Sequence, residues 1–455
     1  MSAVLDEVIA LTRLVPLSEA VEVNPKIDRT TLHDDLDVSF VPMAAVEALT
    51  GDIDVSIIRK YAEVKKGYTS FRDGDILFAK VTPCMENGKM AIARKLVNGG
   101  GFGSTEFHVL RPRAGVDARY IYYFVSSQTF RKEASGHMTG AVGLRRVPSA
   151  YLEAQLIPLP PIDEQREIVA EIEKQFSRLD EAVANLKRVK ANLKRYKASV
   201  LKDAVEGRLV PTEAELARRE GRSFETGEQL LQRILEARRN SWSGRGKFRT
   251  TDAPERDASE LPKGWTRSSI DQLADVGTGA TPNRGKAEYW NDGVVPWVTS
   301  SVVNADHVDK ASEFVTQRAL AETNLTLYPA GTLLVAMYGE GKTRGKCAEL
   351  RIPAATNQAL AALQVDDQVR AYVRHFLELN YEEMRKVATG GVQPNLNLSL
   401  VRAVAVPLPP LAEQHRIVAE VDRRLSIVHG VEAEVDAGLK RTQALRQSVL
   451  INAFG

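Results

Sequence analysis

The stretch AMYGEGKTRGKC, residues 336–347, carries residue types that are able to bind phosphate. Its first eight residues match the pattern A/G-x-x-x-x-G-K-[ST], and the strand-like run GTLLV precedes them. In a phosphate-binding P-loop, a glycine-rich turn and its lysine surround the phosphates of a nucleotide. Under this interpretation Lys342 and Thr343 belong to a nucleotide-driven enzyme.

The residues around the stretch disfavour that interpretation. A P-loop needs a helix directly after Gly-Lys-Thr, whereas Gly345 and Pro353 leave little room for one. The strand LAALQVDD, which would supply an Asp for magnesium, is interrupted by Gln364. Other catalytic patterns are also missing: the sequence has no H-E-x-x-H, no G-x-S-x-G and no Asn/Asp-Pro-Pro-Tyr/Phe run.

An internal repeat explains the stretch in another way. The segment IPLPPIDEQREIVAEIEKQF, from Ile157, returns as VPLPPLAEQHRIVAEVDRRL from Val406, and GDILFAK, from Gly74, returns as GTLLVAM from Gly331. The Gly-Lys pair 88–89 corresponds to the pair 345–346, but Cys84, Met85 and Glu86 stand where the second copy has Gly-Lys-Thr. Both copies therefore share a strand, a polar loop and a Gly-Lys, which favours a recognition protein.

Each copy predicts a globular part of roughly 150 residues followed by a long helix. Short apolar runs such as DILFAKV and AALQV, broken by Gly, Pro and Asn, indicate strands. The runs RYIYYFVSSQTFRKEAS and RAYVRHFLELNYEEMRKVA correspond in the repeat and predict one helix each. A short amphipathic helix, GEQLLQRILEARRN, and a polar linker are predicted between the copies.

After each PLPP the apolar period becomes heptad-like, which is typical of a two-helix coiled coil. Acidic residues dominate the first half of each helix and basic residues the second half, so antiparallel packing brings opposite charges together; the helix macrodipole is an alternative cause of the same bias. The predicted seam consists of Val169, Ile172, Phe176, Leu179, Val183, Leu186, Leu193, Val200, Val418, Val421, Leu425, Val428, Val435, Leu439 and Val449.

The composition is that of a globular protein without bulk basicity. Lys and Arg number 61 against 59 Asp and Glu, so any nucleic-acid surface must come from local clustering. The two cysteines, Cys84 and Cys347, are too few for a disulfide framework, and the N-terminal residues lack the pattern of a signal peptide. We expect a cytoplasmic protein.

Several of these features together resemble one known family. The doubled PLPPxxEQxxIV join, the opening GWTRSSIDQLADVGTGATP of the second half and the loop YGEGKTRGKCA are similar to the specificity subunit of type I restriction-modification systems, over nearly the whole chain. The resemblance implies an α+β fold with two repeat-related target-recognition domains separated by two long antiparallel coiled-coil helices, in a pseudo-twofold internal repeat. It also implies that each domain reads one half of a bipartite asymmetric DNA site.

The resemblance further implies partners and domain limits. The partners are double-stranded DNA, two methyltransferase subunits and the restriction/translocase subunits; S-adenosylmethionine, ATP and Mg are expected on the partner subunits only, and this chain is expected to be non-catalytic and to hold no cofactor or metal. The expected domains are residues 1–157 (first recognition domain), 158–206 (central helical region), 207–260 (short helix and linker), 261–406 (second recognition domain) and 407–455 (distal helical region).

Candidate DNA-binding residues are polar side chains in loops that correspond between the copies, because such groups contact phosphates and base edges. The candidates are Asn24, Lys26, Lys80, Thr82, Asn87, Lys89, Ser104, Thr105, Arg145, Arg146, Thr281, Asn283, Arg284, Tyr338, Lys342, Thr343, Arg344, Lys346, Asn357, Gln358, Gln393 and Asn395. Two other hypotheses stay open at this point: a nucleotide-driven enzyme that uses Lys342 and Thr343, and a coiled-coil scaffold that reads no bases.

Overall fold

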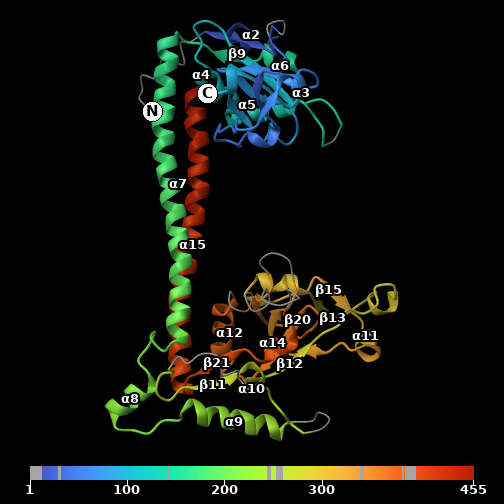
Figure 1. Cartoon of the computed structure of the whole chain (residues 1–455), viewed down its shortest axis with the longest axis vertical. Helices are drawn as coiled ribbons and strands as arrows, with labels where there is room; N and C mark the ends of the chain where they lie inside the picture. The colour runs from blue at the N-terminus through green and yellow to red at the C-terminus, as the bar shows by residue number, and fades with distance from the viewer. Residues whose placement is uncertain are drawn as a thin grey trace. The chain divides into compact units, whose positions relative to one another are not determined.

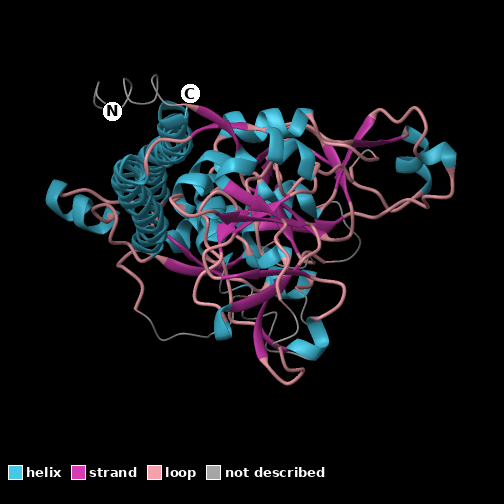
Figure 2. Cartoon of the chain, turned by 90° about the horizontal axis from the view of Figure 1, so that it is seen from above, coloured by secondary structure: helices cyan, strands magenta, loops and turns pink. Residues whose placement is uncertain are grey.

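The computed structural model describes residues 13–28, 32–141, 143–242, 247–252, 260–338, 343–381, 384 and 396–454. The chain divides into two compact units. The first unit comprises residues 1–189 and 434–455, and the second comprises residues 190–433. Both contain helices as well as strands (Figures 1 and 2).

The first unit holds two four-stranded sheets, in the strand orders β2-β9-β6-β7 and β4-β3-β8-β5, and the separate pair β1-β10. Among the strand pairs of the described residues of this unit, β3 and β8 run parallel and the others are antiparallel. The elements are β1 (Leu14–Pro16), α2 (Leu17–Ala20), β2 (Val21–Val23), β3 (Asp37–Val41), η1 (Met43–Ala45), β4 (Ile58–Lys60), α3 (Tyr61–Val64), β5 (Thr69–Arg72), β6 (Ile76–Ala79), β7 (Met90–Ile92), η2 (Val97–Gly99), β8 (Gly100–Gly103), β9 (Phe107–Pro112), α4 (Ala118–Ser126), α5 (Gln128–Gly136), α6 (Ser149–Ala154) and β10 (Leu156–Pro158).

The second unit repeats this plan. Its sheets have the orders β12-β20-β17-β18-β14 and β15-β13-β19-β16, beside the pair β11-β21, so within the described residues the sheets differ from those of the first unit by the added strand β14. The elements are α8 (Glu213–Glu220), α9 (Gly227–Asn240), β11 (Thr266–Ser269), α10 (Ile270–Leu273), β12 (Ala274–Thr278), η3 (Ala287–Tyr289), β13 (Val295–Val298), η4 (Ser300–Asn304), β14 (His307–Val308), β15 (Glu313–Val315), α11 (Gln317–Glu322), β16 (Leu327–Tyr328), β17 (Leu333–Ala336), β18 (Cys347–Leu350), β19 (Ala354–Thr356), β20 (Leu360–Val365), α12 (Arg370–Leu379), α14 (Leu398–Arg402) and β21 (Ala405–Leu408). The repeat read from the sequence is thus a repeat of strand order.

The central strands β6 and β17 show why the repeated motif is kept. All four residues of each strand are buried, which suits a continuous apolar run. Gly74 and Gly331 precede these strands with φ values of 90° and 89°. L side chains rarely adopt that conformation, so a glycine at the start of the motif lets the chain turn into the core.

One predicted helix is divided into two. The run from Arg119 to Ser135 forms α4 and α5, because Ser127 adopts an extended conformation and its hydroxyl caps α5 by accepting a hydrogen bond from the Phe130 N–H. The corresponding run in the second copy forms α12, and most of its predicted continuation lies outside the described residues.

The PLPPxxEQ joins are held by the same hydrogen bonds in both copies. The Tyr120 hydroxyl donates to the Pro158 carbonyl at 2.7 Å, and the Gln165 side-chain amide donates to the Pro160 carbonyl at 2.8 Å. Tyr372 and Gln414 make the same two bonds, at the same lengths, to Pro407 and Pro409. Each glutamine is buried, so its bond to a prolyl carbonyl satisfies a buried polar group at the start of the long helix.

The two long helices are α7 (Ile162–Val205) and α15 (Leu411–Phe454), of 44 residues each. In the first unit the beginning of α7 packs on the end of α15, for example Ile172 near Leu450 in one apolar cluster. In the second unit the end of α7 packs on the beginning of α15, through Val200 and Val421. The helices therefore run antiparallel, as predicted, and in Figure 1 they lie side by side.

Opposite charges meet across this helix pair. Arg446 of α15 forms an ion pair with Asp180 of α7, and its guanidinium lies 4.1 Å from the centre of the Phe176 ring. The predicted seam residues are all buried or half-buried. The buried residues Ile417 and Leu450 belong to the apolar clusters as well, although the heptad pattern did not single them out.

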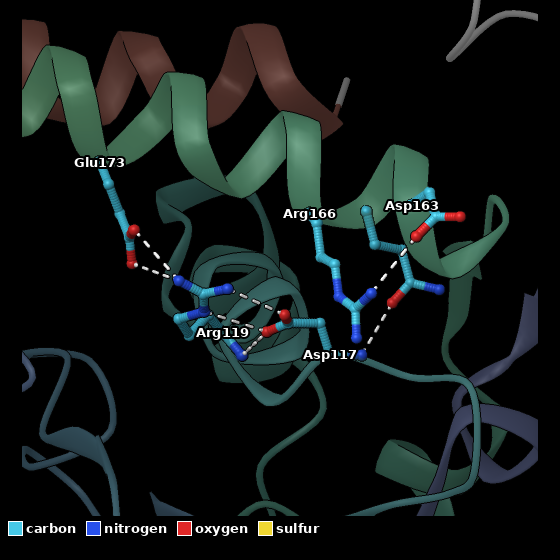
Figure 3. A network of polar contacts seen from close by, with 6 residues as sticks. Asp117, Arg119, Asp163, Arg166 and Glu173 are labelled. Atoms are coloured by element: carbon cyan, nitrogen blue, oxygen red, sulfur yellow. Dashed lines mark hydrogen bonds and ion pairs between the residues drawn. The ribbon is translucent and has the colours of Figure 1, made fainter.

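In the first unit, charged side chains fix the globular part to α7 (Figure 3). Arg119 of α4 lies between Asp117, at 3.1 Å, and Glu173 of α7, at 3.2 Å. The Asp117 carboxylate also caps α4 by accepting from the Arg119 N–H at 2.8 Å. This attachment therefore joins α4 to α7 through one guanidinium and two carboxylates, without a histidine.

In the second unit, the corresponding attachment contains a histidine. His375 of α12 lies 3.0 Å from Asp422 of α15, the residue that corresponds to Glu173 in the repeat. Glu378, one turn further along α12, forms an ion pair at 2.6 Å with Lys197 of α7. The segment predicted as a short helix and linker also packs here: Leu230 and Ile234 of α9 enter the core of the second unit.

Candidate DNA interface

In the first unit, three chain segments that carry candidate residues meet at one end of the central sheet. The Lys80 N–H donates to the Glu106 carbonyl, and the Val147 N–H donates to the Lys80 carbonyl, both at 2.9 Å. The Asn24 N–H donates to the Val109 carbonyl at 2.7 Å. Backbone hydrogen bonds thus join residue 80 to residues 106 and 147, and residue 24 to residue 109, although these residues are distant in the sequence.

A groove of about 620 Å³ opens beside these segments. Three candidates, Asn24, Lys26 and Lys80, line it together with Tyr68, Thr69 and Ser70 of the neighbouring sheet. Its floor is apolar, with Phe107 and Val109. A groove with a lysine, an asparagine, hydroxyls and a ring offers donors to phosphates and base edges.

The charges at this groove are coupled. Arg146 forms a two-pronged ion pair with Glu106, at 2.6 and 2.8 Å, and this hydrogen bonding lowers the pKa of Glu106. Burial lowers the pKa of Lys80; Glu106 raises it and Arg146 lowers it further, with a net lowering. The lysine therefore holds its proton less firmly than an exposed one.

Behind the groove lies a buried imidazole. His108 contacts the Val147 carbonyl through Nε2 at 2.8 Å and the Asn24 side chain through Nδ1. Burial lowers the pKa of His108. The neutral ring thus holds Asn24 and the 147 segment in place, and Asn24 keeps a φ of 53° in this arrangement.

The remaining candidates of the first unit differ in their engagement. The Thr82 hydroxyl donates to Glu86 at 3.2 Å, and the Lys89 ammonium donates to the Met43 carbonyl at 3.2 Å. The Ser104 hydroxyl accepts from the Glu106 N–H at 3.2 Å. Asn87 and Thr105 are exposed and Arg145 is half-buried.

The loop of the second unit corresponds in its last residues. Gly345 has a positive φ of 86°, like Gly88 in the first copy, whose φ is 73°. The Gly345 N–H donates to the Ala336 carbonyl. The Lys346 ammonium donates to the Asn304 side chain at 3.0 Å. Tyr338 is exposed and Thr343 and Arg344 are half-buried, while Lys342 lies outside the described residues.

Strand β18 begins at Cys347, directly after this loop. A nucleotide-binding loop needs a helix N-terminus there, to direct N–H groups at the phosphates. The described residues after Thr343 supply a turn and a strand in its place. The P-loop interpretation of AMYGEGKTRGKC is therefore wrong, because the helix that it requires after the loop is replaced by strand β18.

Other candidates of the second unit are already bonded. The Thr281 hydroxyl donates to Gln358 at 2.8 Å, and the Asn357 side chain accepts from the Ala359 N–H at 3.2 Å. The Asn283 side chain accepts from the Gly285 N–H. Thr281, Asn283 and Gln358 are nevertheless exposed, and Gln393 and Asn395 lie outside the described residues.

Arg284 has a structural role that its sequence context did not indicate. Its guanidinium lies 3.8 Å from the centre of the Trp290 ring and 5.0 Å from that of Trp297, and it forms an ion pair with Glu313. Such stacking attracts the cation to the ring faces. The arginine is half-exposed but pinned, so reaching DNA requires it to leave this site.

Three residues of the interface were missed from the sequence: Glu106, His108 and Asn304. Cations and amides are the side chains that bind phosphate, so an acidic residue beside Thr105 carries no such signal. Asn304 follows Val303 in the matched segment PWVTSSVV and was detectable as a polar residue beside a repeated strand. No sequence signal distinguishes His108, because its role depends on burial.

Two features are absent from the described part of the chain. No group of three or more His, Cys, Asp or Glu residues there is placed to hold a metal ion. No helix among those residues is long and apolar enough to cross a membrane.

The fold defines a protein with two globular modules of similar topology, each followed by a long helix. A family model described as "Type I restriction modification DNA specificity domain" matches residues 14–195 and 262–435. The chain belongs to this family, which confirms the resemblance drawn from its motifs.

Named relatives have the same description. The chain is 40% identical over 166 residues to the specificity subunit of the type I restriction enzyme EcoAI from Escherichia coli, a match that covers 36% of this chain and 28% of that protein. It is 24% identical over 355 residues to the EcoKI specificity subunit of Escherichia coli strain K12, covering 76% and 67% of the two chains. The match thus spans less than a third of the EcoAI relative.

A solved structure supports the fold. It comes from work described as the structural basis of complex assembly and conformational transition of the type I R-M system. That chain superposes with a TM-score of 0.67 at 20% sequence identity, and the alignment covers 97% of each chain. The predicted fold class, two repeat-related domains with two long antiparallel helices, is confirmed.

Proposed function

We propose that this chain is the DNA-specificity subunit of a type I restriction-modification complex and that each recognition domain reads one half of a bipartite, asymmetric DNA site. The duplication carries the proposal. Two domains of similar strand order carry different side chains at corresponding positions: Lys80 and Glu106, which can donate and accept hydrogen bonds, stand in the first where the apolar Met337 and Ala359 stand in the second. Different donors and acceptors at one position select different base edges.

The two long helices set the distance between the half-sites and dock two methyltransferase subunits. Large apolar side chains along α7 and α15 support the docking role, because they are exposed where a lone helix pair would favour polar residues. These residues are Val189, Tyr196, Ile427, Val431 and Leu445. The restriction/translocase subunits then complete the complex in the cytoplasm.

Chemistry belongs to the partners in this proposal. S-adenosylmethionine, ATP and Mg bind to the methyltransferase and restriction subunits, whereas this chain supplies sequence recognition and no catalytic residue. A division of this kind is economical in structure, since recognition needs only a few bidentate contacts, each worth about 1 to 3 kcal/mol of discrimination.

Methylation mapping tests the proposal. The chain is assembled with its methyltransferase subunits, random DNA is modified, and the methylated sites are aligned. We expect a split motif of two different half-sites around a gap of unspecified bases. A single continuous motif, or equal binding to all duplexes at a fixed salt concentration, would contradict it.

A further inference from the structure

Beside the groove of the first unit, the Glu106 carboxylate holds the guanidinium group of Arg146 in one orientation. Both carboxylate oxygens of Glu106 are used, accepting from Nε and Nη2 of Arg146 at 2.8 and 2.6 Å. The pair is partly open to solvent, since the side chains are 42% and 28% exposed. Exposed ion pairs contribute little to stability, so the main physical effect of this one is to fix the orientation of Arg146.

The backbone of Arg146 is fixed as well. Its N–H donates to the Thr139 carbonyl at 2.8 Å, and the Thr139 N–H donates back to the Arg146 carbonyl at 3.0 Å. Val81 forms a further β-bridge to Arg146, which ties the residue to the loop that follows the central strand β6. Both ends of the side chain are therefore held before any ligand arrives.

The guanidinium keeps donors that Glu106 does not use. Arg146 has five N–H groups, of which two bind Glu106 and one, on Nη1, donates to the Leu144 carbonyl at 3.3 Å. The remaining N–H groups lie on Nη1 and Nη2, the two nitrogens that form a fork. Such a fork matches the O6 and N7 acceptors of guanine in the major groove.

The second domain lacks this device at the corresponding positions. The backbone bond from Lys80 to Glu106 returns as a bond from Met337 to Ala359, so a methionine and an alanine replace the lysine and the glutamate. Without a carboxylate, the second domain has no group there to hold an arginine. The residue that corresponds to Arg146 lies outside the described residues.

We propose that Arg146 is a specificity-determining residue of the first domain, which reads one guanine through its O6 and N7, and that Glu106 is the positioning residue that orients it. This inference rests on the proposed function and adds a base identity to one half-site. A phosphate contact by Arg146 would carry no base identity, so the two roles differ in whether a letter of the half-site depends on this residue.

The test uses the full chain assembled with its methyltransferase subunits and a library of random duplexes. The variants are Arg146→Gln, Arg146→Lys and Glu106→Gln. We expect a guanine at one position of one half-site in the unaltered complex, and each variant should weaken the preference for that guanine by about 5- to 100-fold. The other positions and the other half-site should keep their letters.

Arg113→Gln is the matched control, since it removes one charge from the same domain. Arg113 lies beyond the other end of β9 and donates to the Ser18 carbonyl, so no letter should change. Arg146→Lys keeps the positive charge but removes the forked pair of donors. If Arg146→Gln fails to assemble, the guanine preference of Arg146→Lys alone tests the inference.

Two results would overturn the inference. One is a motif without guanine in either half-site; the other is a uniform loss of binding in Arg146→Lys and Arg146→Gln with all letters kept, which indicates a phosphate contact. In both cases a split motif from the unaltered complex would leave the proposed function standing. The absence of any split motif would instead remove the proposed function itself.

Discussion

His375 joins the second globular part to α15 through a group that changes its charge with pH. Burial lowers its pKa, but the hydrogen bond to Asp422 and the neighbouring Glu378 raise it by more, so the net pKa lies above the ordinary value. Two cations lie nearby. Lys197 forms an ion pair with Glu378, and the positive charge of Arg374 lowers the pKa of His375. At neutral pH the ring is thus more protonated in the folded state than in the unfolded chain.

Stability should therefore depend on pH through His375. A raised folded-state pKa favours folding fully below the unfolded value of about 6.5, and this contribution is lost as the pH rises through the folded-state pKa. Thermal unfolding of the full chain at pH 6 and pH 8 should show a larger fall in Tm for the unaltered chain than for His375→Gln. Each kcal/mol corresponds to about 2 to 4 °C for a domain of this size.

Arg119→Gln is the control at this scale. It breaks the attachment to Glu173 in the first unit, which is made by an arginine and a carboxylate and involves no histidine, so the fall in Tm between pH 6 and pH 8 should equal that of the unaltered chain. Equal pH dependence of the unaltered chain and His375→Gln would show that the histidine contributes nothing to attachment.

Residue types at the interface could be predicted from the sequence only in part. Lys80 and Arg146 were predicted because cations in matched loops suit DNA. Glu106 was not predicted, because its role is to hold Arg146. The two residues are brought close by the backbone hydrogen bonds that join residue 80 to residues 106 and 147. The stacking of Arg284 on two tryptophans was likewise hidden, because it depends on the tertiary position of β13.

At the scale of elements, α7 and α15 are continuous helices with one antiparallel seam. Gly438 lies against Leu186, which sets their register. The heptad pattern predicted both helices because an apolar period persists over many turns. The break at Ser127 was not predictable in the same way, since the apolar period continues across it and only the serine cap marks the interruption.

Removing one heptad from both helices tests their role as a spacer. Deleting residues 183–189 together with the facing residues 435–441 keeps the seam paired and shortens it by about 10 Å, the rise of about three base pairs. We expect the gap in the methylated motif to shorten, or methylation to cease, while the letters of any remaining half-sites stay the same. Changed letters would show that the helices take part in base reading.

At the scale of the whole molecule, two copies of one topology are joined to their helices by identical bonds. The bonds of Tyr120 and Tyr372 to prolyl carbonyls do not involve the interface residues. The repeated join predicted this organisation from the sequence, whereas the parallel pairing of β3 with β8 and of β13 with β19 could not be read from any local pattern. Long-range pairing depends on the closure of the whole sheet.

A chimera with two first copies tests this organisation. Residues 14–157 replace residues 267–406, because Leu14 and Arg267 hold the same position in the paired strands next to each join. The methylated motif should then have two halves with the same letters. Halves that still differ would mean that something outside the globular parts contributes to recognition; thermal unfolding checks that the chimera folds.

Under the proposed function, the unequal residues at matched positions, Lys80 and Glu106 against Met337 and Ala359, also give the complex with DNA a direction. A DNA-binding protein with two identical domains can bind a symmetric site in two equivalent orientations, which doubles its association rate statistically. A protein with two different recognition domains lacks this advantage, because it binds an asymmetric site in one orientation only. In return, one end of every bound site is distinguishable from the other, and a partner docked on either side occupies a defined position upstream or downstream.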